Sequence, residues 1–129
     1  MPLRLKLLTE LFKSLSGTPR LRIVNLLCVQ SLPVGDMQQV LRCSQSYLSR
    51  HLAILRATNV VRTKRMGKQI WYSLSRASFL NYPLANMLNE INSSFPQLEA
   101  DRKRLLEIKE KDFLERSGER SPELSGDEG

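Results

Sequence analysis

The sequence predicts a mostly helical α+β fold, a winged helix-turn-helix, and two patterns carry that prediction. Apolar residues recur at helical spacing in four segments between residues 3 and 57, but alternate with a period of two over 60–75. The last two helical segments are separated only by a tight turn. Two such helices followed by a β-hairpin are the order expected of a helix-turn-helix with a wing.

Glycine and proline divide the N-terminal part of the chain into short helices. Gly17 ends the first, and Thr18 is expected to cap the second, with Pro19 where its missing N–H costs nothing. Pro33 and Gly35 interrupt the chain again before a short third helix. The three helices are expected over 3–16, 19–30 and about 35–42.

The fourth helix, expected over 44–57, has an apolar stripe and a polar face. Leu48, Leu52 and Leu55 fall at i, i+4 and i+7 on one side and should anchor the helix to the core. Ser44 is expected to cap its N-terminus. Because leucines take the core positions, the Gln, Ser, Arg and His side chains are left for solvent or a partner.

These polar side chains are of the types that bind duplex DNA in its major groove. Gln and Arg pair bidentately with adenine and guanine edges, so Gln45 and Arg50 are the predicted base contacts. Hydroxyl groups and a helix N-terminus suit phosphate oxygens. The predicted DNA-contacting residues of this helix are Ser44, Gln45, Ser46, Tyr47, Ser49, Arg50 and His51.

A β-hairpin is expected over 60–75, with its turn around Gly67. Ile70, Tyr72 and Leu74 alternate with other residues in the manner of a strand. The hairpin is basic and would lie as a wing along the DNA backbone or in the minor groove. Its predicted phosphate contacts are Arg62, Lys64, Arg65, Lys68 and Gln69.

The distribution of charge agrees with a nucleic-acid partner. The chain has a net charge of +7, but residues 1–76 hold 13 Lys and Arg against 2 acidic residues, whereas residues 77–129 hold 7 against 11. A generic solubilising surface could also be basic. The basic half therefore points to DNA because it coincides with the polar helix and the hairpin.

Two more helices are expected in the C-terminal half, one over 77–93 and one from Pro96 to about 115. The second is densely charged, so we expect a solvated helix with one apolar edge. Residues 117–129 lack apolar periodicity and are expected to be a disordered acidic tail, which leaves 1–116 as the folded domain. The apolar edge consists of Leu98, Leu105, Ile108 and Phe113.

Two stretches, LFKSLSGTPRLRIVNLL and SQSYLSRHLAILRATNVVRTKRMGKQIWYSL, resemble the ArsR-type (arsenic-repressor-like) winged-helix transcriptional regulators. The resemblance covers about residues 8–92. It implies a homodimeric repressor that binds an inverted-repeat operator on double-stranded DNA and releases it when an inducer binds. It also implies a dimer interface made by about 3–15 and 97–115.

The sequence departs from this family at its metal sites. The family's cysteine pair would fall at Pro33 and Gly35, which cannot ligate a soft metal. The family's second site would fall in 77–95, which has no His or Asp and only Glu90. We therefore expect no metal site and no cofactor, and the inducer is unknown.

Cys28 and Cys43 are candidate redox thiols, with structural roles as the alternative. Cys43 follows Arg42 and precedes the polar helix, so its thiolate is expected to be favoured. His51, the single histidine, cannot build a zinc site and is expected to contact DNA or pack locally.

A different class of function, a winged-helix module that binds protein without sequence-specific DNA binding, remains open. An enzyme is not expected, because the sequence offers no nucleophile–histidine set and no glycine-rich phosphate loop. No apolar run approaches the roughly 20 residues of a membrane span. With only two cysteines, the chain is expected to be cytoplasmic.

Overall fold

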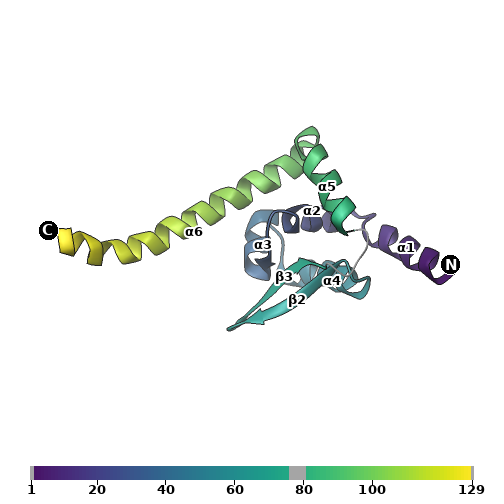
Figure 1. Cartoon of the computed structure of the whole chain (residues 1–129), viewed down its shortest axis with the longest axis horizontal. Helices are drawn as coiled ribbons and strands as arrows, with labels where there is room; N and C mark the ends of the chain where they lie inside the picture. The colour runs from purple at the N-terminus through teal and green to yellow at the C-terminus, as the bar shows by residue number, and fades with distance from the viewer. Residues whose placement is uncertain (1, 76–80, 129) are drawn as a thin grey trace.

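The computed structural model describes residues 2–75 and 81–128, and its helices and β-hairpin follow one another in the predicted order (Figure 1). Three short helices and a small sheet form the centre, while α1 and the long α6 extend from it in different directions. The elements are α1 (Pro2–Ser14), α2 (Thr18–Leu27), β1 (Leu32–Pro33), α3 (Val34–Leu41), α4 (Gln45–Ala57), β2 (Val61–Met66), β3 (Gln69–Leu74), α5 (Asn81–Ile91), the 3₁₀ turn η1 (Asn92–Ser94) and α6 (Pro96–Glu128).

The leucine stripe of α4 is buried, as predicted. Leu48 and Leu52 are each 1% exposed and Leu55 is 0% exposed, and they belong to one core with Met37 and Val40 of α3. Burial of a leucine side chain contributes about 1.5–3 kcal/mol. The stripe therefore fixes α4 against α3 and leaves its opposite face outward.

The turn between α3 and α4 is tight because one residue adopts a left-handed conformation. Arg42 has a φ of 54°, and its N–H donates to the carbonyl of Gln38 at 2.8 Å. Ser44 then caps α4, as predicted, since its Oγ accepts a hydrogen bond from the Tyr47 N–H at 3.2 Å. The prediction of Thr18 as a cap was wrong: α2 begins at Thr18 itself, after Gly17.

The hairpin is present, but it belongs to a three-stranded antiparallel sheet of order β1-β3-β2. Gly67, with a φ of +63°, makes the turn between β2 and β3. Strand β1, in which Leu32 pairs with Tyr72 and Pro33 with Trp71, was not predicted from the sequence. A strand of two residues is too short to show a period of two.

The C-terminal helices differ from the prediction in their bounds. Helix α5 begins at Asn81, so the expected start at residue 77 lies outside the described residues. Helix α6 continues to Glu128, beyond the predicted end near 115 and through the stretch expected to be a disordered tail. That expectation rested on missing apolar periodicity, which reports packing against a core and not backbone conformation. The division of the chain at residue 116 stays a prediction.

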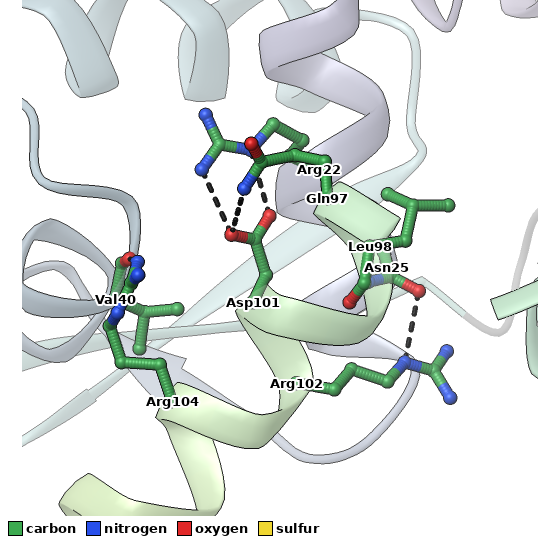
Figure 2. A network of polar contacts seen from close by, with 8 residues as sticks. All are labelled: Arg22, Asn25, Val40, Gln97, Leu98, Asp101, Arg102 and Arg104. Carbon is green, nitrogen blue, oxygen red and sulfur yellow. Dashed lines mark hydrogen bonds and ion pairs between the residues drawn. The ribbon is translucent and has the colours of Figure 1, made fainter. Parts of the chain in front are cut away.

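Charged residues, and not only an apolar edge, attach α6 to the centre (Figure 2). Asp101 is fully buried, and Arg22 of α2 donates two hydrogen bonds to its carboxylate, from Nε at 2.7 Å and from Nη2 at 2.9 Å. Arg102 Nε donates to Asn25 Oδ1 at 2.9 Å, and Arg104 Nη1 donates to the carbonyl of Val40 at 2.6 Å. Helix α6 is therefore fastened to both α2 and α3.

We predict that Asp101→Asn lowers the free energy of unfolding by roughly 3 kcal/mol or more, because it leaves Arg22 without its charged partner at a buried site. Chemical denaturation of the two proteins measures the difference. Glu99→Gln, on the exposed side of the same helix, is the matched control and should change stability little. Equal stability of all three proteins would contradict this role for Asp101.

Candidate nucleic-acid interface

The outward face of α4 contains nearly all the residues that were predicted for it. Ser44, Gln45 and Ser46 are exposed at the helix N-terminus, and Ser49 and Arg50 are exposed in the next turn. Tyr47 and His51 also lie on this face, but their rings contact other side chains of the protein. One end of α4 therefore presents amide, hydroxyl and guanidinium groups together, while the leucines hold its other side.

Tyr47 and His51 form a small cluster with two arginines. Their rings meet edge to face, with centroids 4.7 Å apart and an interplanar angle of 72°, and the Arg50 guanidinium carbon lies 5.9 Å from the Tyr47 ring centre. Arg20 of α2 donates from Nη1 to His51 Nδ1 at 3.2 Å. Burial, followed by the charges of Arg20 and Arg50, lowers the pKa of His51, so the ring is held neutral at pH 7.

The role of Arg20 was not predicted from the sequence. Its contact with His51 joins residues 31 positions apart, and no local period marks it. The apolar periodicity of α2 identifies only its inward residues and gives no partner for a polar side chain at its start.

The wing does not bring its predicted phosphate contacts to one face. Directly opposed residues of an antiparallel pair share a face, and Lys64 opposes Trp71 whereas Arg65 opposes Ile70. Arg62 and Lys64 therefore lie on one face and Arg65 on the other. All five predicted side chains are exposed: Arg62, Lys64, Arg65, Lys68 and Gln69.

Helix α6 reaches the face of the wing that holds Lys64. Lys109 Nζ lies 5.6 Å from the centre of the Trp71 ring, and the same ammonium pairs with Asp36 Oδ2 at 2.5 Å. A single lysine thus connects α6 with the start of α3 and with the sheet. The other face of the wing is turned toward α4, and there Tyr72 of β3 and Ser49 of α4 line one hollow.

Both cysteines are free thiols, and neither is set up as a thiolate. Burial raises the pKa of Cys28 to about 11, although Arg102 opposes the rise. Burial also raises the pKa of Cys43, and the cation that opposes it is Arg22. The expectation that Arg42 favours the Cys43 thiolate was therefore wrong, because desolvation outweighs the neighbouring charge. The proposed redox role of the two cysteines stays a prediction.

We predict that Cys28 reacts with iodoacetamide at pH 8 roughly a hundredfold more slowly than a thiol of pKa 9.0, because only the thiolate attacks. The Cys43→Ser variant isolates Cys28, and mass spectrometry follows the alkylation. The unfolded variant in denaturant supplies the reference rate. Equal rates in the folded and unfolded protein would contradict the burial of Cys28.

The parts of the chain that the structure describes contain no group of three or more His, Cys, Asp or Glu residues able to hold a metal ion. Over those same residues, no helix is both long and apolar enough to cross a membrane.

The turn at Arg42, the anchored helix α4 and the basic hairpin together define a winged helix-turn-helix protein, an architecture of DNA-binding regulators. The model of the family described as bacterial regulatory protein, arsR family, matches residues 19–63. The arsenical resistance operon repressor of Staphylococcus aureus is 36% identical over 89 residues, which cover 69% of this chain and 84% of that protein. This chain belongs to the ArsR family of bacterial transcriptional regulators.

Two further relatives agree with the assignment. The transcriptional repressor SmtB homolog of Synechocystis is 34% identical over 74 residues, covering 57% of this chain but only 56% of that relative's length. The structure of reduced HlyU from Vibrio cholerae has a TM-score of 0.61 at 28% identity, over 74% of this chain and 95% of that chain. The family and these relatives are transcriptional regulators and not enzymes.

Proposed function

We propose that this chain is a homodimeric transcriptional repressor that binds an inverted-repeat operator, with α4 in the major groove and the β2–β3 wing against the DNA backbone or minor groove. The observation that carries the proposal is the division of α4. Three buried leucines fix one side, and the exposed side presents Gln45, Arg50 and several hydroxyl groups. Names of relatives that are repressors support the same function.

The exposed apolar side chains of the two outer helices support dimerisation through about 3–15 and 97–115. Of the leucines on α1, Leu11 is buried, but Leu3 and Leu7 are 68% and 55% exposed. Exposed apolar groups of this kind on a single chain indicate a protein partner, and a second copy supplies matching helices under two-fold symmetry. Among the described residues of these two helices, the large apolar side chains that are more than half exposed are Leu3, Leu5, Leu7 and Phe12 on α1 and Leu106, Phe113 and Leu114 on α6.

The signal that releases the operator is proposed to be other than a metal of the family type, in line with Pro33 and Gly35 at the positions of the family's cysteine pair. Oxidation of Cys28 or Cys43 is one candidate for such a non-metal signal. The raised pKa values of both thiols, however, favour a structural role for the two cysteines. A cytoplasmic location, where DNA is accessible, belongs to the same proposal.

The docking arrangement predicts different losses for a base contact and a phosphate contact. Gln45→Ala should lower affinity for the operator by roughly 1–3 kcal/mol and relax specificity at one base pair. Lys64→Ala should weaken binding to all sequences alike and reduce the slope of log K against log salt by about 1. Fluorescence anisotropy on DNA from upstream of its own gene, with scrambled DNA as the control, measures both.

If DNA binding by the unmodified chain depended neither on sequence nor on salt concentration, the proposed repressor function would be rejected. A winged-helix module that binds protein would then be favoured. If Gln45→Ala and Lys64→Ala lost DNA affinity with the same dependence on sequence and the same salt slope, the proposed placement of α4 and the wing would be rejected.

We predict that Leu7→Glu combined with Phe113→Glu converts the chain from a dimer to a monomer, because charges replace apolar groups in the interface. Sedimentation velocity at micromolar concentration measures the mass, and circular dichroism verifies the fold. Met66→Glu, which replaces a 51% exposed side chain on the wing, is the control and should leave the dimer intact. A monomeric unmodified chain would overturn the proposed interface.

A further inference from the structure

We propose that Arg20 is a positioning residue that fixes the tautomer of His51, so that His51 enters the DNA interface as a hydrogen-bond donor through Nε2. The DNA part of this inference rests on the proposed function. The tautomer itself follows from contacts within the chain and can be tested without DNA.

The direction of one hydrogen bond determines the tautomer. Arg20 Nη1 lies 3.2 Å from His51 Nδ1, and a guanidinium group can only donate. Nδ1 must therefore accept, which means that it carries no proton. In a neutral imidazole the proton then resides on Nε2. The lowered pKa of His51 agrees with the neutral ring that this contact requires.

Arg20 is itself held by a second hydrogen bond, at the end of α1. Its Nε donates to the carbonyl of Ser14 at 2.5 Å, and Ser14 is the last residue of α1. Gly17 leaves room for the guanidinium, since a Cβ at that position would lie 3.3 Å from Arg20 Nη2. The side chain therefore spans from the end of α1, past Gly17, to the ring on α4.

The ring of His51 is also restrained. Tyr47, one turn earlier on α4, meets it edge to face at 4.7 Å, and the charged groups around the cluster are Arg20 and Arg22 of α2 and Arg50 of α4, with the Cys43 thiol in the same hollow. Among the described residues, no second hydrogen bond reaches the ring. Nε2–H is thus the group left for a partner, and that partner must supply an acceptor: a phosphate oxygen or the acceptor edge of a base.

The single histidine makes the tautomer directly measurable. Long-range ¹H–¹⁵N spectra of the unmodified chain without DNA, recorded above the pKa of His51, should show Nε2 protonated and Nδ1 bare. Arg20→Gln should increase the share of the Nδ1–H form and raise the pKa of His51, because it removes both the obligate donor and a nearby cation. Arg20→Lys, which keeps a donor and a charge, should restore both values at least in part.

Arg56→Gln is the matched control, since Arg56 is an exposed arginine of α4 five positions after His51, whereas side chains on a helix meet at spacings of three and four. It should leave the tautomer unchanged. A dominant Nδ1–H form in the unmodified chain, or equal spectra for the unmodified and Arg20→Gln proteins, would overturn the assignment of Arg20.

Two substitutions test the donor at the DNA. A Gln side chain can place its amide nitrogen near the position of His Nε2, whereas Asn places its amide near Nδ1. His51→Gln should therefore stay within about threefold of the unmodified affinity, and His51→Asn should lose about tenfold, the equivalent of one hydrogen bond. Equal affinities of the two variants would reject the donor role.

The DNA used separates the two acceptors. A loss with His51→Asn on operator and scrambled DNA alike identifies a phosphate, and a loss confined to the operator identifies a base edge. Absence of any duplex binding by the unmodified chain would reject the proposed function and the DNA step, while the spectra still decide whether Arg20 sets the tautomer.

Discussion

The carboxylate of Asp101 is fully buried, and both of its oxygens accept hydrogen bonds from Arg22. A buried charge is stable only with such a partner, so α6 can dock on α2 in one register. The neighbouring contacts follow from that register: Arg102 meets Asn25, and Arg104 meets the carbonyl of Val40 at the end of α3. The position of the helix-turn-helix relative to α6 therefore depends on this ion pair.

The two helices proposed to form the dimer are both tied to the elements that would meet DNA. Helix α6 is joined to α3 and to the sheet through Lys109, which contacts Asp36 and Trp71. Helix α1 is joined to α4 through Arg20, which contacts the Ser14 carbonyl and His51. In a symmetric dimer, the distance between two copies of α4 is then set by the same side chains that hold α1 and α6.

The sequence predicted the parts of the fold that depend on local periodicity. A few neighbouring residues are enough to predict the leucine stripe of α4, its Ser44 cap and the turn at Gly67. The docking of α6 was not, because Arg22 and Asp101 lie 79 positions apart and densely charged helices usually face solvent. The split of Arg62 and Arg65 between two faces of the wing was predictable, since adjacent odd and even strand positions point in opposite directions.

The energies of these contacts indicate where a signal could act. A tenfold loss of DNA affinity requires about 1.4 kcal/mol of coupling. Breaking the buried Arg22–Asp101 pair costs roughly 3–5 kcal/mol, so a signal that disrupted it would endanger the fold. The Lys109–Asp36 pair and the Lys109–Trp71 contact are partly exposed and individually weaker, yet they also connect α6 with α3 and the wing. A signal that acted on the Lys109 contacts would therefore weaken the connection of α6 with α3 and the wing at a smaller cost in stability than loss of the Arg22–Asp101 pair.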